Sequence, residues 1–391
     1  MSSENSPLIS KSLNIVCLDV PFPADYGGAI EAFYKLKSFS ELGVKIYLHC
    51  FVYGDRKPQE YLNQLCEKVY YYPRERSIKY LFSNTPFIVK SRRNVDLLNN
   101  LRSNDFPILF DATHTTGFLN HPDLKDRKKI VRLHNIEWIY YRILLDSSFS
   151  IKEKFFYFSE YKKLREYDAV LKEAAILSCL SQSDEEYYRE KFPEKNISLE
   201  CVFHENKTVT SKAGKGNYIL YHGNLSLLDN YQIIFKLLKN ELKDCQYPII
   251  LAGKNPDKSL FDLIKSRPNI QIIANPSSVE MQALLQEAHI CLAIAKNPSG
   301  VKLKLINSLF ATRFVVSNEN ALAGSGLDDL CMVPTSEDFA TIINTLMQQS
   351  FDDSQIQHRK QILEEKYNNS SNAKKLINHI FGLDLNISNE I

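Results

Sequence analysis

Lys302 and Lys304 stand two positions apart in a segment whose composition could bind a phosphate. Residues 298–310 begin with proline, serine and glycine and continue as an apolar run of helical spacing, which predicts a short loop leading into a helix. The first turn of a helix offers unpaired backbone N–H groups and a partial positive charge, so it attracts anions. Each charge-assisted hydrogen bond from a lysine would add about 1.5–3 kcal/mol. An isolated Lys-x-Lys pair is more often part of a solvated helix face. Whether these two lysines form a phosphate site therefore depends on the other polar segments of the chain.

A second candidate segment leads from the first apolar run into the helix that follows it. Residues 21–28 contain two prolines and end in Gly27 and Gly28. Paired glycines between a strand and a helix let a backbone come close to a ligand that a side chain would block. The three-glycine fingerprint of dinucleotide sites is missing, and no acidic residue is placed to bind a ribose. The Gly-Lys-Ser/Thr signature of a P-loop is also missing, so a nicotinamide cofactor and a P-loop nucleotide are both disfavoured.

Polar residues follow two further apolar runs. His134 and Glu137 come at the end of the run 130–133, just before the only tryptophan of the chain, and His114 follows the run 107–110. Ligands of parallel sheets bind at the carboxyl ends of the strands, where such side chains gather. A lone histidine is more often a structural donor than a catalyst. Because both histidines follow strands of the same predicted sheet, His134, Glu137 and His114 are the candidate catalytic residues.

Two series of short apolar runs, separated by segments of helical period, predict the elements that position these residues. In the first half the predicted strands are residues 14–20, 44–51, 107–110, 130–133 and 197–202. In the second half they are residues 218–221, 248–251, 270–273, 290–295 and 314–317. A helix is predicted over residues 29–42, with Gly43 as its left-handed cap.

The polar segment 206–217 is the best candidate for a linker. The sequence therefore predicts an α/β protein with an N-terminal Rossmann-like domain over 1–205, a C-terminal Rossmann-like domain over 206–369, and a helix and tail over 370–391 that pack across a domain surface. Two parallel sheets of this kind would face an interdomain cleft, where open α/β folds bind ligands.

Composition excludes several classes of protein. The 391 residues include 48 basic and 46 acidic side chains, for a net charge of +2, so nucleic acid is a poor partner. No secretion signal and no run of about eighteen apolar residues is present, so we expect a cytoplasmic protein. The eight cysteines are scattered singly, which predicts neither a disulfide framework nor a metal site.

The segment 151–165 interrupts the pattern, because it mixes aromatic residues with lysines on a predicted helix. A basic, aromatic helix can lie in a layer of lipid headgroups, and this would give peripheral contact with the inner face of the membrane. The alternative is a packed helix with a solvated, charged face, which Glu153 and Glu160 favour because they dilute the positive charge.

Together these segments resemble glycosyltransferase family 4, whose members are retaining enzymes of the GT-B fold that use sugar nucleotides. The resemblance covers nearly the whole chain. It rests on the order and spacing of the Pro-x-Pro loop ending in Gly27-Gly28, Arg-x-His134-Asn-x-Glu137, Leu180-Ser181-x-x-Asp184, Tyr221-His-Gly-Asn224-Leu, Ser299-Gly300-Val-Lys302-Leu-Lys304 and Ala323-Gly-Ser-Gly-Leu327.

The resemblance implies a hexosyltransferase-type enzyme. It would move a sugar from a nucleotide-diphosphate donor to an acceptor hydroxyl of a growing glycan, a glycolipid or a protein-linked glycan, with retained configuration. No metal is obligatory, and the nucleotide sugar is a co-substrate, so no cofactor is expected. The glycine loop would approach the donor diphosphate and the two lysines would neutralise it. The residues implied to bind the donor are Gly27, Gly28, Asn224, Ser299, Gly300, Lys302, Lys304 and Asn307.

The chain departs from the family pattern at two places. The usual Glu-x7-Glu pair falls on Ser299 and Asn307, and many relatives carry Arg and Lys near the positions of Asn224 and Asn230. Transfer on one face of the sugar asks a protein for charge stabilisation and positioning more than for a carboxylate nucleophile, so the missing pair is compatible with activity. Two alternatives remain: a GT-B protein that binds sugar nucleotides without turnover, and a sugar-nucleotide epimerase.

Overall fold

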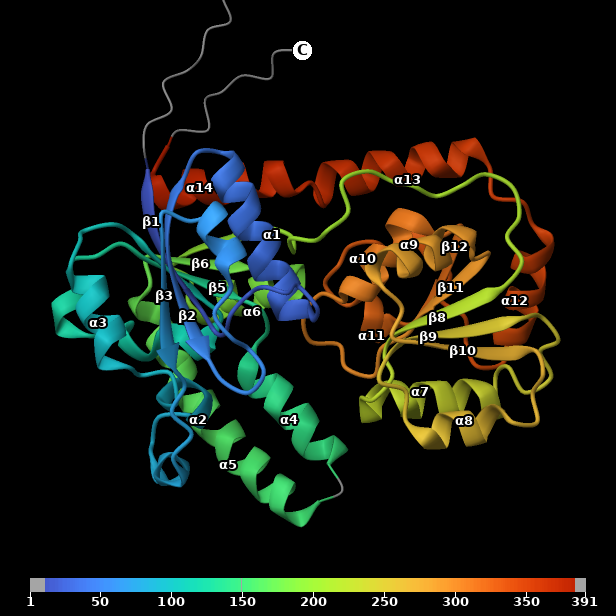
Figure 1. The fold of residues 1–391 in the computed structure, drawn as a ribbon, viewed down its shortest axis with the longest axis horizontal. Helices are drawn as coiled ribbons and strands as arrows, with labels where there is room; N and C mark the ends of the chain where they lie inside the picture. The colour runs from blue at the N-terminus through green and yellow to red at the C-terminus, as the bar shows by residue number, and fades with distance from the viewer. Residues whose placement is uncertain (1–10, 149, 384–391) are drawn as a thin grey trace, which may run out of the picture. The chain divides into compact units, whose positions relative to one another are not determined.

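The computed structural model describes residues 11–148 and 150–383. Two compact units form the chain, one from Met1–Glu205 with Asn369–Ile391 and the other from Asn206–Asn368. We call them the N-terminal unit and the C-terminal unit. Each is built on its own parallel sheet, with helices on both faces (Figure 1). The division after Glu205 falls at the start of the polar segment, but the last helix belongs to the N-terminal unit.

The sheet of the N-terminal unit has seven strands, all parallel, in the order β3-β2-β1-β4-β5-β6-β7. Its strands are β1 (Ser12–Cys17), β2 (Lys45–Val52), β3 (Lys68–Pro73), β4 (Ile108–Asp111), β5 (Lys129–Leu133), β6 (Ile176–Cys179) and β7 (Asn196–Leu199). The strand order reverses between β1 and β4, which is where open α/β sheets bind their ligands.

Helices cover both faces of this sheet. They are α1 (Gly27–Glu41), α2 (Phe87–Lys90), α3 (Val95–Arg102), α4 (Glu137–Ser147), α5 (Ile151–Tyr167), α6 (Gln182–Lys191) and α14 (Asn369–Phe381). Five short 3-10 turns join them, η1 (Glu60–Gln64), η2 (Ile78–Phe82), η3 (Thr113–Phe118), η4 (Pro122–Leu124) and η5 (Asp168–Glu173). One core packs α1 and α14 on the sheet, with Leu36 and Leu376 fully buried. A second core on the opposite face buries Leu97 of α3 and Tyr188 of α6.

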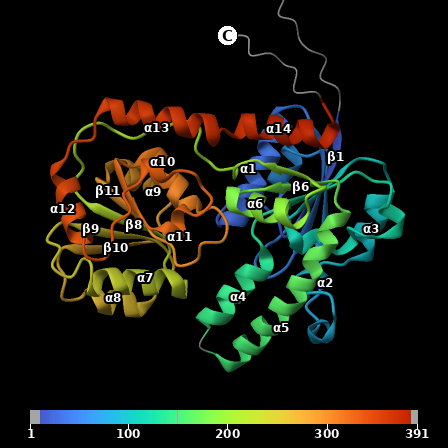
Figure 2. The ribbon, with the colours of Figure 1, turned by 180° about the vertical axis from the view of Figure 1, so that it is seen from behind.

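The sheet of the C-terminal unit has five parallel strands in the order β10-β9-β8-β11-β12. Its strands are β8 (Ile219–Asn224), β9 (Ile249–Lys254), β10 (Ile270–Ala274), β11 (Ile290–Ala293) and β12 (Phe314–Ser317). Its helices are α7 (Leu228–Lys239), α8 (Lys258–Ile264), α9 (Ser278–Glu287), α10 (Leu303–Ala311), α11 (Glu319–Leu322), α12 (Phe339–Gln348) and α13 (Asp353–Lys366), with the short turn η6 (Asp328–Leu330). Helices α7 and α8 lie side by side on one face (Figures 1 and 2).

The predicted left-handed cap at Gly43 and the predicted strands of the second half are confirmed. Gly43 has a φ of 78°, the left-handed conformation that ends a helix at low cost with glycine. The hydroxyl of Ser181 accepts a hydrogen bond from the backbone N–H of Asp184 at 3.1 Å and so caps α6. The five strands predicted in the second half are all present, with ends that differ by up to three residues.

Two strands of the N-terminal sheet, β3 and β6, were not predicted, and β1 ends at Cys17 although the first strand was predicted to reach residue 20. The helix predicted within residues 370–391 is α14, which begins at Asn369, and its apolar side chains lie in the core of the N-terminal unit.

Candidate functional site

Lys302 precedes the first residue of α10 and lies against the loop that enters this helix. Its ammonium group donates to the carbonyl oxygens of Ser299 and Gly300, the latter at 2.7 Å. Gly300 has a φ of 70°, which a side chain would disfavour, so the loop turns there at a glycine. The positive charge of Lys302 is therefore held at the start of α10, where the aligned peptide groups of the helix add a partial positive charge.

Lys304 lies on the first turn of α10 and reaches the carboxyl end of the sheet. Its Nζ donates to the carbonyl of Ile294, just after β11, and lies 3.5 Å from the hydroxyl of Tyr221 and 5.0 Å from the centroid of that ring. Burial, together with the charge of Lys302, lowers the pKa of Lys304 to about 8. The side chain is therefore mostly charged at neutral pH, and its position is fixed by the backbone and by an aromatic face.

Asn224 joins this cluster through two intermediate residues. The hydroxyl of Tyr221 donates to Oδ1 of Asn230 at 2.8 Å, and Nδ2 of Asn230 donates to the carbonyl of Asn224 at 2.8 Å. Asn224 is the last residue of β8 and Asn230 lies in the first turn of α7. Lys304 and Asn224 thus belong to one hydrogen-bonded group at the carboxyl ends of β8 and β11.

The two positions that carry carboxylates in the family pattern hold neutral polar side chains. Oδ1 of Asn307, one turn after Lys304 on α10, accepts from Nδ2 of Asn206 at 2.8 Å. The backbone N–H of Ser299 donates to Oδ1 of Asn297 at 2.7 Å, which shapes the loop before Lys302. The predicted donor-binding residues of the C-terminal unit are therefore gathered around one helix N-terminus.

Gly27 and Gly28 are the first residues of α1 in the N-terminal unit. A Cβ at Gly28 would lie 3.0 Å from the ring of Tyr26, so a side chain there would press on the tyrosine. The hydroxyl of Tyr26 donates to the carboxylate of Asp19, two residues after β1. The glycine loop is thus fixed against the carboxyl end of the first strand.

His134 is oriented by a buried aspartate that the sequence analysis missed. Its Nε2 donates to Oδ1 of Asp111 at 3.0 Å, and Nζ of Lys35 lies 2.5 Å from the same oxygen. Burial alone would raise the pKa of Asp111, but the charge of Lys35 and the hydrogen bonds from Lys35 and His134 hold it well below its usual range. Asp111 is therefore an ionised, permanent acceptor that fixes the imidazole.

Further buried charges support this pair. Oε1 of Glu31 lies 3.6 Å from Nζ of Lys35 and 3.0 Å from Nε of Arg132. Arg132 also donates to the hydroxyl of Ser178 at 2.8 Å and to the carbonyl of Glu200 at 2.9 Å. One sequence signal could have revealed part of this network, because Glu31 and Lys35 are spaced i, i+4 on the predicted helix, among its apolar positions.

Glu31, Asp111 and His134 also have the ligand types of a metal site, with their ligand atoms within 4.8 Å of one another. The ammonium of Lys35 and the guanidinium of Arg132 already neutralise the two carboxylates. A divalent cation at this place would meet two fixed positive charges, so this donor set does not suit a metal.

Glu137 and His114 form a second pair at the same edge of the sheet. Oε1 of Glu137 lies 3.6 Å from Nδ1 of His114, and this nitrogen is buried without a hydrogen-bond partner among the described residues. Burial raises the pKa of Glu137 to about 8, although a hydrogen bond with Asn135 opposes the shift. Burial and the positive charge of Arg92 lower the pKa of His114 well below its usual value. At neutral pH the pair is thus a protonated carboxylic acid beside a neutral imidazole.

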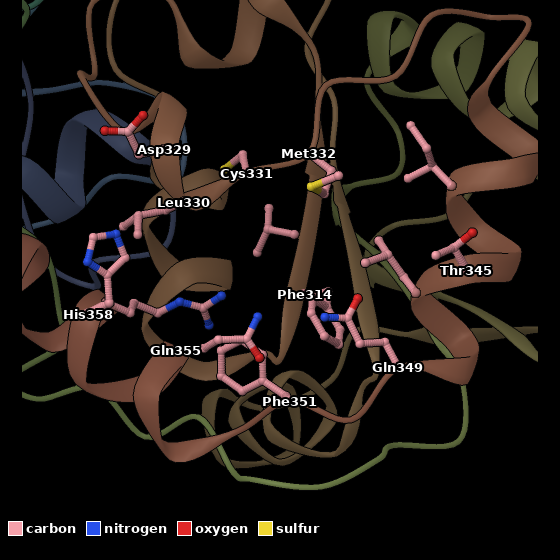
Figure 3. Close-up of a pocket in the computed structure, with 14 residues that line it drawn as sticks. Phe314, Asp329, Leu330, Cys331, Met332, Thr345, Gln349, Phe351, Gln355 and His358 are labelled. Atoms are coloured by element: carbon pink, nitrogen blue, oxygen red, sulfur yellow. The ribbon is translucent and has the colours of Figure 1, made fainter.

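A pocket of about 420 Å³ in the C-terminal unit holds none of the predicted residues (Figure 3). Phe314 at the start of β12, Met332 and Phe351 contribute to its wall. Arg359, which also lines it, donates to the hydroxyl of Ser211 at 2.9 Å and to the carbonyl of Arg313 at 2.6 Å. The guanidinium group of Arg359 thus makes hydrogen bonds within the protein.

Across residues 11–148 and 150–383, none of the helices has both the length and the apolar composition that crossing a bilayer requires.

Comparison with family models gave no match. An uncharacterized 44.6 kDa protein in the cps region of Klebsiella pneumoniae is 28% identical over 335 residues, which span 80% of this chain and 84% of that protein.

Three solved structures share the fold along nearly the whole chain. TarM has a TM-score of 0.67 at 11% identity, covering 96% of this chain and 100% of that one. Sucrose-phosphate synthase from Thermosynechococcus elongatus has a TM-score of 0.66 at 13% identity, with the same coverage of 96% and 100%. HepE from Anabaena, in complex with UDP and glucose, has a TM-score of 0.62 at 12% identity and covers 95% and 100%. The predicted fold, two Rossmann-like parallel-sheet domains of the GT-B class, is confirmed.

Proposed function

We propose that the chain is a glycosyltransferase that moves a sugar from a nucleotide-diphosphate donor to an acceptor hydroxyl. The observation that carries the proposal is the charged start of α10, where the ammonium groups of Lys302 and Lys304 are held by backbone carbonyls. A departing diphosphate needs this kind of fixed positive charge. The shared fold with sucrose-phosphate synthase, and with HepE holding UDP and glucose, supports the proposal.

In the mechanism that we propose, the C-terminal unit binds the donor. The diphosphate accepts hydrogen bonds from the first turn of α10 and from Lys302 and Lys304, so the negative charge that develops on the leaving oxygen is stabilised in place. The leaving phosphate takes the proton of the acceptor hydroxyl as the new glycosidic bond forms on the same face of the sugar. This route retains the configuration of the sugar. It requires positioning of the reactants and no carboxylate nucleophile, so the absence of a carboxylate at Ser299 and Asn307 does not prevent it.

The N-terminal unit would bind the acceptor and orient the sugar. His134 has a fixed ring because Asp111 holds its Nε2, so its other nitrogen can accept a hydrogen bond from a sugar hydroxyl. Glu137, protonated at neutral pH, can donate a hydrogen bond or accept one, and it lies beside His114. We assign positioning to these residues, and approach to the diphosphate to Gly27 and Gly28.

We further propose membership of glycosyltransferase family 4 and transfer of a hexose to a growing glycan or glycolipid, with no cofactor beyond the nucleotide sugar. The order of the motifs along the sequence supports this assignment.

The second candidate function is a protein that binds sugar nucleotides without turnover. One observation favours this second candidate. The amide oxygen of Asn307 accepts a hydrogen bond from Asn206, and Ser299 cannot ionise, so neither position supplies a carboxylate.

We also propose peripheral contact with the inner face of a membrane through α5. Ile151 and Phe155 on this helix are 85% and 77% exposed, and Phe158 is exposed as well. Helices α4 and α5 lie side by side as a pair (Figures 1 and 2). Nζ of Lys163 donates to the carbonyl of Leu81 at 3.1 Å, so α5 contacts η2, which carries two more exposed apolar side chains.

Substitution of Lys304 tests the proposed function. Lys304→Met keeps the apolar stem of the side chain and removes the charge. We expect turnover to fall by about 10²–10³, the usual cost of losing one preorganised donor at a developing oxyanion. Lys265→Met is the matched control, because Lys265 is an exposed lysine of the same unit.

The assay combines calorimetry against a panel of nucleoside diphosphates with measurement of donor consumption and product. Near-native turnover of Lys304→Met would remove this residue from the mechanism. Nucleotide binding by the native chain without turnover of any donor would favour the second candidate function. No nucleotide binding at all would reject both.

A further inference from the structure

Two arginine side chains gather at the carboxyl edge of the N-terminal sheet. Arg74 directly follows β3, and Arg92 lies two residues after α2 and is only 3% exposed. Both guanidinium groups lie over the ring of Tyr53, at 4.7 Å and 5.6 Å from its centroid. Within residues 11–148 and 150–383, neither guanidinium has a carboxylate oxygen within 4.0 Å.

Neutral groups hold both arginines in place. Nε of Arg74 donates to the hydroxyl of Ser91 at 3.0 Å. Nε of Arg92 donates to the carbonyl of Leu18 at 2.7 Å, just after β1, and its Nη1 donates to the carbonyl of Ile88 at 2.8 Å. Burial and the nearby charge of Arg74 lower the pKa of Arg92 to about 10, so the group stays charged at neutral pH. The two positive charges are thus fixed, close to each other and not neutralised by direct ion pairs.

The surrounding titratable groups balance these two charges only in part. The imidazole of His114 is neutral and its buried Nδ1 has no hydrogen-bond partner in the described part of the chain. Glu137 is mostly protonated at neutral pH. Asp19 contributes one negative charge near Arg92, and its carboxylate also accepts a hydrogen bond from the hydroxyl of Tyr26. The site therefore has an excess of positive charge and a polar atom without a partner.

Buried charges in proteins are paired or bind a ligand, because an unpaired charge removed from water is costly. The planar guanidinium group presents two parallel N–H donors that match the oxygens of a phosphate. We propose that Arg74, Arg92 and His114 form a binding site for a phosphate ester carried by the acceptor. This inference rests on the proposed function and deepens it by naming an anionic acceptor. A lipid headgroup and a soluble sugar phosphate share this chemistry.

Calorimetry on the full chain tests the site with inorganic phosphate as the probe, in the presence of saturating UDP. We expect saturable binding that weakens at least tenfold in Arg74→Gln and stays unchanged in Arg102→Gln. Arg102 is the matched control, since it is a half-exposed arginine of the same unit paired with Asp123 at 3.3 Å. If Arg74→Gln does not fold, Arg74→Lys keeps the charge but loses the two parallel donors, and we expect about threefold or greater weakening.

Two further titrations identify the source of the phosphate. Tighter binding of short-chain phosphatidic acid than of glucose 6-phosphate indicates a lipid acceptor, and the reverse order indicates a soluble sugar phosphate. The inference is overturned if the native chain shows no saturable phosphate binding, if saturating UDP abolishes it, or if the Arg74 variants bind phosphate as tightly as the native chain. UDP binding without phosphate binding would reject this inference alone, whereas phosphate binding without binding of any nucleoside diphosphate of the panel would reject the donor-dependent function alone.

Discussion

Two buried carboxyl groups in the N-terminal unit differ in charge because their neighbours differ. Asp111 contacts the ammonium of Lys35 and the imidazole of His134, and the charge of Lys35 together with these two hydrogen bonds keeps it ionised despite burial. Burial has the largest effect on Glu137, and the nearby carboxylates of Asp184 and Asp168 add to it, so the pKa of Glu137 rises to about 8 although Asn135 and Arg92 oppose the shift. Asp111 can therefore hold the imidazole ring of His134 in place, and Glu137 can exchange a proton near neutral pH.

The shifted pKa of Glu137 predicts a specific dependence of stability on pH. The folded chain keeps a proton that the unfolded chain loses above a pKa of 4.5. The contribution of Glu137 to the free energy of unfolding therefore has its full value at acidic pH. It decreases as pH rises from about 4.5 to about 8, by about 1.4 kcal/mol per pH unit. Glu137→Gln mimics the protonated form and should remove this slope. Urea unfolding at several pH values between those limits measures it.

Other groups titrate in the same range, so the prediction concerns the difference between the native chain and the variant. Glu67→Gln, at an exposed position, is the control and should unfold with the native slope. If the curves of the native chain and Glu137→Gln run parallel over this pH range, Glu137 is already ionised in the folded protein and the assignment of a protonated acid is wrong.

Sequence reasoning found the residues with a local signature and missed those whose role depends on tertiary contacts. Lys304 opens a helix and Asn224 ends a strand, and hydrogen bonds through Tyr221 and Asn230 connect them in one group. Asp111 looks like the polar end of an apolar run, and 76 positions separate it from Lys35. Nothing in the spacing of these two residues indicates that they meet, because the packing of α1 on the sheet brings them together.

Among the elements, α5 presents apolar side chains to solvent together with lysines. Ile151 and Phe155 are exposed, as are Lys152 and Lys154 beside them. Insertion of the apolar groups into a bilayer is favourable by roughly 1.5–3 kcal/mol for each fully buried side chain, and lysines near anionic lipid add about 1 kcal/mol each. This combination fits a surface that docks on an anionic membrane.

The double variant Ile151→Ser, Phe155→Ser tests this element. We expect its partition onto vesicles containing phosphatidylserine to fall at least tenfold in a sedimentation assay, because two inserting groups are lost. Val279→Ser is the matched control, since Val279 is 81% exposed on α9 of the C-terminal unit. Equal partition of the double variant and the native chain would exclude α5 as a membrane contact.

The two strands that were missed lack a clear signature for different reasons. Central strands such as β4 and β11 are short apolar runs, Ile-Leu-Phe-Asp and Ile-Cys-Leu-Ala, which is typical of parallel sheets covered on both faces. The edge strand β3 reads Lys-Val-Tyr-Tyr-Tyr-Pro and is mostly half-buried, so it lacks that signature. The strand β6 has only four residues and closely follows a helical segment, so its apolar pattern merges with the helix before it.

At the scale of the whole molecule, the N-terminal unit is discontinuous in sequence. The chain leaves this unit at Glu205 and returns to it at Asn369. On its return, α14 buries Leu376 and Ile380 in the core that α1 also lines. Nδ1 of His379 lies 2.9 Å from the buried carboxylate of Glu200. The N-terminal unit is therefore complete only when the last helix has been synthesised.

Removal of α14 should unfold one unit and spare the other. A chain ending at residue 368 loses the four apolar side chains that α14 contributes to the core, Ala373, Leu376, Ile377 and Ile380. The three larger ones alone stabilise the fold by roughly 1.5–3 kcal/mol each, a total comparable with the 5–15 kcal/mol stability of a typical domain. The C-terminal unit is continuous over Asn206–Asn368 and keeps its own core, so it should remain folded.

Hydrogen exchange resolved by peptide separates the two responses. In the chain ending at 368, peptides from β1, β2 and α1 should lose their protection, whereas peptides from β8, β9 and α10 should exchange as in the full chain. A chain ending at residue 383 keeps all of α14 and serves as the control, with protection expected in both units. Native protection of β1 after truncation at 368 would show that the first sheet folds without its last helix, and the apolar contacts of α14 would then contribute little to the stability of the N-terminal unit.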